Sequence, residues 1–228
     1  MGANCVLYYI TDRKAFSSDE GARRDGLLEK IAEASRAGVD YIQLREKDLP
    51  AREIETLARD AVGVIREHSG LATGERQPGT ILLINSRTDL ALAANAGGVH
   101  LTAEDVSPRD VRKAWKLART EGRENSAVSA RISVSCHSTQ EVTHAADAGA
   151  DLALLGPIFE KKDAPGIRTL GIDALGEAAR AKIPVLALGG VTLHNAESCL
   201  RAGVVGIAAI RLFQENDLAG VVRALRAM

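Results

Sequence analysis

Polar and charged side chains cluster in the segment QLREKD. If this segment ends a β-strand, the alternation of side chains points Gln43, Arg45 and Lys47 to one side of the sheet. Arginine presents a planar fork that binds phosphate through two hydrogen bonds, and lysine adds a compact charge. The segment therefore predicts a phosphate or pyrophosphate site. A structural ion-pair network with Glu46 and Asp48 is the alternative.

A second group of polar residues follows two further apolar segments. Asn85 and Ser86 close the segment ILLINS, and Asp105 follows the segment GVHLT. A carboxylate at a strand end can hold Mg²⁺ beside a phosphate. Asp105 is also well placed near the next helix, where the helix dipole stabilises an acidic side chain. The spacing alone favours that structural role.

The segment SVSCHS brings Ser135 and His137 to the end of another apolar run. Histidine titrates near neutral pH, so His137 is a candidate general acid or base, with a structural role as the alternative. Cys136 lies between them and would point to the opposite face of the strand. We therefore expect Cys136 in the core rather than as a nucleophile.

Glycines end two more apolar segments, at Gly156 and at the pair Gly189 and Gly190, and a last segment runs into Ile210 and Arg211. Backbone N–H groups after the last two strands of a β/α barrel commonly hold phosphate. Glycine lets a phosphate approach the backbone closely. A simple chain reversal is the alternative role for these glycines.

Eight short segments rich in Val, Ile and Leu must position these residues, and we expect each to be a buried parallel strand. They cover residues 6–11, 40–45, 80–85, 98–102, 131–137, 152–156, 184–189 and 204–210. Segments with apolar residues at helical spacing separate them. Four end in a turn of the Ala-Gly type, in SRAGVD, ANAGGV, ADAGAD and LRAGVV, which is typical of a glycine-capped helix followed by a strand.

Eight β/α units in 228 residues predict an α/β protein with one (β/α)8 TIM-barrel domain spanning residues 1–228. A doubly wound open sheet is the alternative. We favour the barrel because closure leaves no edge strand and because no GxGxxG motif follows the first strand. In both folds the ligand site lies beyond the carboxyl ends of the strands.

The composition argues against several classes of protein. The chain has 29 Lys and Arg against 30 Asp and Glu, so it has no overall positive field for nucleic acid or a membrane surface. Aromatic residues make up 3%, which predicts an aliphatic core and argues against stacking on single-stranded nucleic acid. No apolar run reaches the ~18 residues of a membrane span. The three separated cysteines predict neither disulfides nor a zinc site. We expect a cytoplasmic protein with small-molecule partners, and we leave homo-oligomer formation open.

The chain resembles the thiamin phosphate synthase/TenI family over nearly its whole length, through seven motifs in the same order. These motifs are QLREK, LLINSRTDLAL, GVHLTAEDV, ISVSCHS, GPIF, ALGGV and GVVGIAAI. The resemblance implies a barrel enzyme of thiamin biosynthesis that binds hydroxyethyl-thiazole phosphate. Synthases of this family are transferases that couple the thiazole phosphate to pyrimidine methyl pyrophosphate with the help of Mg²⁺ and release pyrophosphate. TenI-type members are isomerases that aromatise a thiazole tautomer by proton transfer and need no metal.

The motifs and the resemblance together imply a set of site residues. His137 matches the histidine that transfers the proton in the TenI branch, and Asp105 matches a magnesium ligand of the synthases. Ser135 matches a contact on the pyrophosphate side. The residues expected to bind substrate are Gln43, Arg45, Lys47, Asn85, Ser135, Gly156, Gly189, Gly190, Ile210 and Arg211.

Two departures from the family pattern determine the predicted activity. Synthases read Asn-Asp where Ser86 follows Asn85 here, so one metal-binding carboxylate is missing. Synthases also read GPIFPTxTK where this chain reads GPIFEKKDAPGIRTLG, and residues 161–168 would have to restore the positive charge. We therefore predict a TenI-like thiazole tautomerase that uses His137. A thiamin phosphate synthase is the first alternative, and a non-catalytic thiazole or thiamin phosphate-binding relative is the second.

Overall fold

The strands of this protein close into a barrel, as the computed structural model shows for residues 5–68, 79–120, 129–160 and 166–228. All eight strands are parallel, and β8 pairs with β1. Their bounds are β1 (Val6–Ile10), β2 (Tyr41–Leu44), β3 (Ile81–Asn85), β4 (Gly98–Leu101), β5 (Arg131–Cys136), β6 (Leu152–Leu155), β7 (Val185–Leu188) and β8 (Gly206–Ala209). Each is one to three residues shorter than predicted. The open-sheet alternative is wrong, because the closed sheet has no edge.

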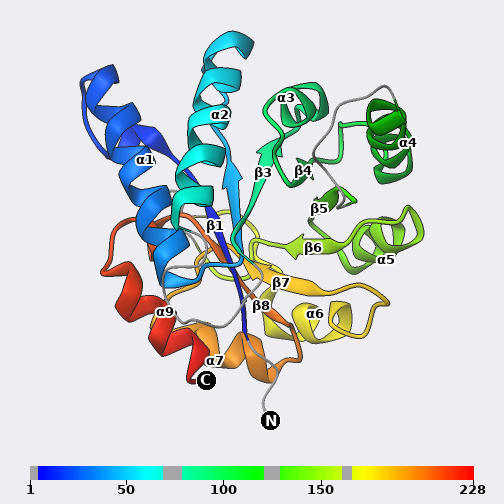
Figure 1. The fold of residues 1–228 in the computed structure, drawn as a ribbon. Helices are drawn as coiled ribbons and strands as arrows, with labels where there is room; N and C mark the ends of the chain where they lie inside the picture. The colour runs from blue at the N-terminus through cyan, green and yellow to red at the C-terminus, as the bar shows by residue number, and fades with distance from the viewer. Residues whose placement is uncertain (1–4, 69–78, 121–128, 161–165) are drawn as a thin grey trace.

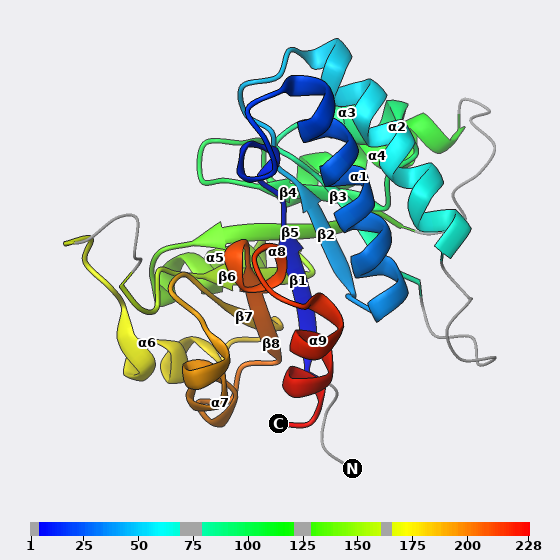
Figure 2. The ribbon, with the colours of Figure 1, turned by 90° about the vertical axis from the view of Figure 1, so that its left-hand side faces the viewer.

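Helices surround the strands as an outer layer (Figures 1 and 2). They are η1 (Arg13–Ala15), α1 (Glu20–Ala37), α2 (Ala51–His68), α3 (Thr88–Ala93), α4 (Pro108–Thr120), α5 (Thr139–Asp147), α6 (Gly171–Ala178), α7 (Leu193–Arg201), α8 (Arg211–Gln214) and α9 (Leu218–Arg226). The short α8 is an extra helix between β8 and α9. In the described part of the chain, no helix is both long enough and apolar enough to cross a membrane.

The predicted turns between helices and strands form through left-handed residues. Gly38, Gly149 and Gly203 follow α1, α5 and α7 with φ angles of 84°, 84° and 98°. In the fourth turn, ANAGGV, the positive φ of 53° falls on Asn95 instead of a glycine. Asparagine tolerates this region better than most residues. Each of these turns lets the chain enter a buried strand directly after a helix.

Two layers of core result from the alternation of side chains along the strands. The outer layer, between strands and helices, is mostly aliphatic, as the composition predicts. The interior of the barrel has an apolar cluster of Tyr8, Ile10, Leu83, Leu152, Leu154, Leu186 and Ala208. It also buries polar side chains on β2, β4 and β5, namely Gln43, His100 and Ser133. The prediction of an aliphatic core is therefore wrong for the part of the barrel interior that Gln43, His100 and Ser133 occupy.

Candidate active site

The carboxyl ends of β2 to β5 bring the predicted polar residues together at one mouth of the barrel. The strand register pairs Asn85 with His100 and His100 with Ser133. Ser135 lies two residues further along β5. Because alternate residues share a face, Ser133 and Ser135 both point into the barrel. Asn85 and Ser135 are half-buried, as expected for side chains at the rim of an interior.

The loop after β2 is fixed by ion pairs that differ from those the sequence suggested. Buried Glu46 accepts hydrogen bonds from Thr11 Oγ1 at 2.6 Å and from the backbone N–H of Arg13. The Arg13 guanidinium lies 2.9 Å from Asp48 Oδ1 and 3.6 Å from Glu46 Oε2. The expected ion-pair network therefore forms with Arg13, from the loop after β1, and not with Arg45 and Lys47.

The electrostatics of this loop follow from its burial. Burial raises the pKa of Glu46, although the hydrogen bond from Thr11 opposes the shift. The hydrogen bonds from Arg13 lower the pKa of Asp48 to about 2. Arg45 and Lys47 have no ion-pair partner among the residues that the structure describes. They are therefore available to bind an anion.

Asp105 joins the ends of β3 and β4. Its Oδ2 atom accepts hydrogen bonds from Ser86 Oγ at 2.8 Å, from the backbone N of Thr102 at 2.7 Å and from Thr102 Oγ1 at 2.9 Å. It lies before α4, whose first turn contains Asp110 instead. The structural role suggested by the spacing, an acid in the first helical turn, is therefore wrong. Asp105 lies at the mouth, and its role as a metal ligand stays a prediction.

A buried polar cluster that the sequence patterns did not predict lies beneath Ser135. His100 Nε2 lies 2.8 Å from Ser135 Oγ, and His100 Nδ1 lies 2.9 Å from Ser133 Oγ. Tyr8 Oη lies 2.9 Å from Ser133 Oγ and 3.2 Å from Gln43 Oε1. Burial lowers the pKa of His100 to about 3, so its ring is neutral. The signal for these residues was the alternation in GVHL and ISVS, which places His100 and Ser133 on the inner face.

His137 is exposed at the end of β5. Its Nδ1 atom lies 2.7 Å from the backbone oxygen of Gly156, and its backbone N–H donates to Glu141 Oε2. A carbonyl oxygen only accepts, so Nδ1 carries a hydrogen, and Nε2 has no hydrogen-bond partner among the described residues. Cys136 is buried in the outer core, as expected, and burial raises the pKa of its thiol to about 12.

Close packing of the backbone also requires glycine after β6 and β7. An added Cβ at Gly156 would lie 2.2 Å from the backbone oxygen of Leu188. Gly189 and Gly190 have φ angles of 91° and 67°, and a Cβ at Gly190 would lie 2.6 Å from the oxygen of Phe159. These glycines therefore let the loops after β6 and β7 approach each other. This requirement does not conflict with phosphate binding.

Two further predicted positions lie beside this loop pair. Ile210 directly precedes α8, whose first residue is Arg211. In β/α barrels, a short extra helix after the last strand commonly contributes to a phosphate site. Of the segment expected to restore positive charge, residues 161–165 lie outside the described residues, and Arg168 is exposed.

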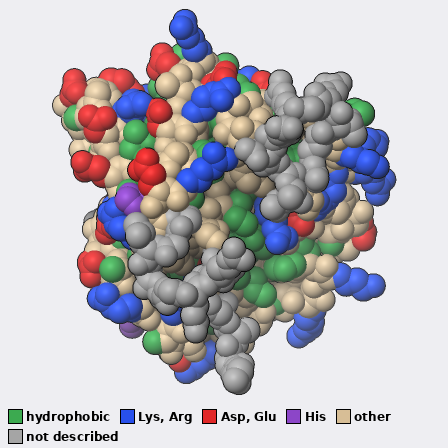
Figure 3. Space-filling view, viewed as in Figure 1, with side chains coloured by type: hydrophobic (Ala, Val, Ile, Leu, Met, Phe, Trp, Pro, Cys, Tyr) green, Lys and Arg blue, Asp and Glu red, His purple; other side chains and the backbone are tan. Residues whose placement is uncertain are grey.

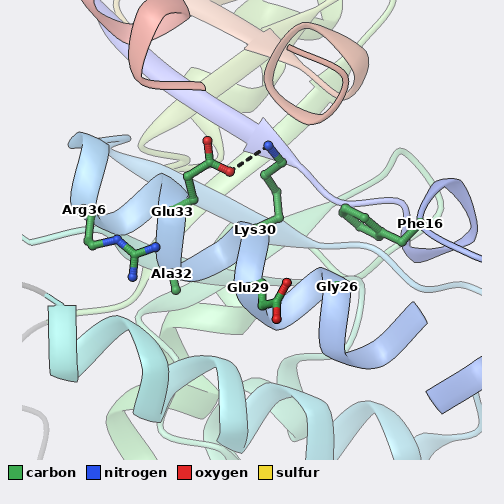
Figure 4. A pocket seen from close by; sticks show the side chains of 7 residues that line it. All are labelled: Phe16, Gly26, Glu29, Lys30, Ala32, Glu33 and Arg36. Carbon is green, nitrogen blue, oxygen red and sulfur yellow. Dashed lines mark hydrogen bonds and ion pairs between the residues drawn. The ribbon is translucent and has the colours of Figure 1, made fainter. Parts of the chain in front are cut away.

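One surface cavity lies away from this mouth. It has a volume of about 500 Å³ and follows α1, where Lys30 Nζ and Glu33 Oε2 form an ion pair at 2.8 Å (Figure 4). None of the predicted site residues lines it. Acidic side chains gather over α1 on the face shown in Figure 3. The cavity is therefore not a continuation of the mouth.

A family model described as thiamine monophosphate synthase, of the TMP-TENI type, matches residues 7–213. The chain belongs to the thiamin phosphate synthase family. Among curated members, it is 38% identical over 226 residues to a putative thiamine-phosphate synthase of Geobacter sulfurreducens, covering 97% of this chain and 93% of the relative. It is 33% identical to a thiamine-phosphate synthase of a Roseiflexus species, covering 98% of this chain and 84% of the relative.

A solved structure of a similarly named protein resembles this chain over the whole fold. The thiamine phosphate pyrophosphorylase of Pyrococcus furiosus superposes with a TM-score of 0.74 at 29% identity, covering 99% of this chain and 95% of that one. The predicted (β/α)8 barrel and the predicted membership of the family are both confirmed.

The donor set at the mouth of the barrel suits one kind of Mg²⁺ site. Among the described residues, no three His, Cys, Asp or Glu side chains converge on one point. The Asp105 side chain forms all its hydrogen bonds to described residues through Oδ2. Mg²⁺ commonly binds one or two carboxylates and completes its shell with substrate phosphate and water. Asp105 therefore fits an ion shared with a pyrophosphate, whereas the mouth does not fit an ion caged by protein alone.

Proposed function

We propose that the chain, folded as a single-domain barrel, is a thiamin phosphate synthase. It joins pyrimidine methyl pyrophosphate to hydroxyethyl-thiazole phosphate and releases pyrophosphate. One observation carries the proposal, namely the convergence of three charges on His100. Burial lowers the pKa of this ring most, the negative charge of Asp105 raises it, and the positive charges of Arg45 and Lys47 lower it further. Two cations without an ion-pair partner among the described residues and one carboxylate thus act on the same ring.

This arrangement suits the departure of pyrophosphate. The carbon–oxygen bond to pyrophosphate breaks, and the pyrimidine methylene carbon then bonds to the thiazole ring. Negative charge accumulates on the leaving group, and fixed cations at that position stabilise it most in the transition state. Arg45 and Lys47 bind the pyrophosphate in this account. Mg²⁺, when bound by Asp105 together with the pyrophosphate, supplies further charge neutralisation.

The remaining polar side chains at the mouth orient the pyrimidine. Gln43 donates from Nε2 to Asn85 Oδ1 at 2.8 Å, so each amide holds the other in one orientation. We assign the thiazole phosphate to the loop of Gly189 and Gly190 and to the start of α8 after Ile210. Barrels commonly bind phosphate at this pair of strand ends. The backbone N–H of Arg211, rather than its side chain, is the group assigned to this phosphate.

The curated relatives described above are named as synthases, and they support this reading over the tautomerase that the sequence pattern favoured. One observation keeps the tautomerase as a second candidate. The hydrogen bond to Gly156 fixes the orientation of the His137 ring, and Nε2 has no partner in the part of the chain that the structure describes, which suits a proton-transfer catalyst. Binding of thiazole phosphate without turnover is the outcome expected of a non-catalytic relative.

Two variants separate these functions. Thiamin phosphate formation is measured with both synthase substrates and Mg²⁺ for the wild type, Asp105→Asn and His137→Ala. A synthase loses roughly 10²-fold of its activity in Asp105→Asn and keeps most of it in His137→Ala. A tautomerase forms no thiamin phosphate, and its conversion of the thiazole tautomer falls by about 10²-fold or more in His137→Ala. Substrate binding without either product identifies the non-catalytic relative.

A further inference from the structure

The hydroxyl of Thr11, the residue after β1, is shared between two residues of the loop after β2. Thr11 is fully buried, and its Oγ1 atom donates to Glu46 Oε1 at 2.6 Å. The same oxygen accepts from the backbone N–H of Arg45 at 3.0 Å. Both directions are fixed, because a carboxylate only accepts and a hydroxyl has one hydrogen. One side chain therefore fastens two consecutive residues of the neighbouring loop.

Thr11 lies on the outer face of the barrel wall, away from the interior. Its N–H donates to the backbone oxygen of Gln43 at 3.0 Å, so the pairing of β1 with β2 continues to this residue. Alternate residues of a strand share a face, and Tyr9 belongs to the core between strands and helices, whereas Tyr8 and Ile10 point to the interior. A ligand in the mouth therefore does not touch the Thr11 side chain. Thr11 acts on a ligand only through the residues it holds.

The loop after β1 holds every second residue of the loop after β2. The backbone oxygen of Glu46 accepts from the N–H of Leu49 at 3.3 Å, which closes a turn around Lys47 and Asp48. Asp48 accepts from the Arg13 guanidinium at 2.9 Å and 3.3 Å. Lys47 therefore stands between two residues whose side chains are fixed from the β1 side.

The loop after β1 is itself fixed from its other side by Gln214, the last residue of α8. Gln214 is buried, and its Nε2 atom donates to the backbone oxygen of Asp12 at 2.6 Å. Its Oε1 atom accepts from the Asp12 N–H at 3.2 Å and from the Tyr9 hydroxyl at 2.9 Å. These bonds tie the residue next to Thr11 to the helix after the last strand. Thr11 therefore presents its hydroxyl from a fixed point.

We propose that Thr11 is a positioning residue that holds Arg45 and Lys47 in the geometry that binds a polyanion. These two cations have no ion-pair partner in the part of the chain that the structure describes. Two such cations on one short loop predict a polyanion as the ligand. A loop that is already ordered binds it without a further loss of conformational entropy. The inference rests on the proposed function only where that function assigns an anion to Arg45 and Lys47.

Binding of inorganic pyrophosphate, measured by calorimetry without turnover, tests this role. Thr11→Val keeps the size of the side chain but leaves the Arg45 N–H without its acceptor. We expect this variant to bind pyrophosphate about threefold to tenfold more weakly than the wild type. Thr11→Ser keeps the hydroxyl, so its affinity should stay within about twofold of the wild type. Wild-type affinity in a folded Thr11→Val variant overturns the proposal.

Tyr9→Phe is the matched control for a general loss of stability. It removes a buried hydroxyl from the same outer face, two residues before Thr11, and that hydroxyl holds Gln214 instead of the loop after β2. We expect a lower melting temperature with unchanged affinity for pyrophosphate. A loss of affinity equal to that of Thr11→Val would show that stability is the cause, and it overturns the proposal.

Amide hydrogen exchange of the wild type adds a test that needs no variant. The Arg45 N–H is hydrogen-bonded to Thr11 without any ligand, so we expect slow exchange before and after pyrophosphate is added. Fast exchange that becomes slow only with pyrophosphate shows that the ligand orders the loop, and it overturns the proposal.

The same binding assay separates this inference from the proposed function. Arg45→Met removes the cation itself and should weaken pyrophosphate binding more than Thr11→Val does. Unchanged binding in Arg45→Met overturns the anion assignment and the role of Thr11 together. If the binding results are as expected and no thiamin phosphate forms, the role of Thr11 stands and only the proposed function is contradicted.

Discussion

Ser86 Oγ donates a hydrogen bond to Asp105 Oδ2 at 2.8 Å. Ser86 has a φ angle of 61°, an uncommon conformation for a residue other than glycine, and its N–H donates to the backbone oxygen of His100 at 2.7 Å. A neutral hydroxyl thus stands at the position where the family pattern has a second carboxylate. It holds Asp105 in place by donation, and in the proposed synthase it leaves one carboxylate for Mg²⁺.

Ser86→Asp is predicted to increase the affinity for Mg²⁺. Aspartate tolerates the left-handed conformation, and a second carboxylate adds an oxygen ligand. We expect half-maximal synthase activity at a lower Mg²⁺ concentration, measured by titrating the metal at saturating substrates. Ser86→Asn is the matched control, because it tolerates the same backbone without adding charge. An equal shift in both variants would show that charge is not the cause.

Arg13→Met is predicted to destabilise the protein by about 3–5 kcal/mol. Arg13 is 3% exposed, and its removal leaves Glu46 buried without its cation. The free energy of unfolding is measured with a chemical denaturant at neutral pH. Lys14→Met is the control, because Lys14 forms an exposed ion pair with Asp48, and such pairs contribute about 0–1 kcal/mol. Similar losses in the two variants would contradict the role given to burial.

Stability is predicted to fall at acidic pH partly through Asp48. Arg13 lowers the pKa of Asp48 in the folded protein to about 2, below its value in the unfolded chain. The unfolded chain therefore binds the proton more tightly, so this contribution is present above the unfolded pKa and is lost as the pH falls toward 2. Melting temperatures of the wild type and Asp48→Asn, from about pH 5 to about pH 2, test this. The wild type should lose more stability than the variant, and parallel curves would refute the assignment.

The three cysteines are predicted to be unreactive in the folded protein. Burial raises the pKa of Cys136 to about 12, and the pKa values of Cys5 and Cys199 to about 11. The thiolate is the reactive form, so labelling by a thiol reagent at neutral pH should follow the unfolding rate. Cys136→Ala should keep its turnover. Rapid labelling of the native protein, or loss of turnover in Cys136→Ala, would contradict this prediction.

The barrel was predictable from the sequence because each strand is a short apolar segment between helical patterns, and a parallel strand buried on both faces has that signature. The position of Cys136 in the outer core, on the face of β5 opposite to Ser135, followed from alternation alone. By contrast, the partner of Glu46 and Asp48 is Arg13, which precedes Glu46 by 33 residues in sequence. Only closure of β1 against β2 brings them together, so local spacing pointed to Arg45 and Lys47 instead.

The residues at the strand ends could be predicted from the sequence, but the polar cluster inside the barrel could not. The strand-end motifs identified Gln43, Asn85 and Asp105, which the register of β2 to β4 brings together. His100 and Ser133 lie within otherwise apolar strands, and a single polar residue in such a strand does not reveal its partners. Their significance depends on hydrogen bonds to Tyr8, which lies 92 and 125 residues away in sequence.

The central claim, synthase activity, is tested most directly by ³¹P NMR of the wild-type protein with both phosphorylated substrates and Mg²⁺. We predict that thiamin phosphate and pyrophosphate appear in equal amounts while both substrates disappear, and that a chelator stops the reaction. Unchanged substrate signals, in a sample that binds both substrates, would contradict the claim.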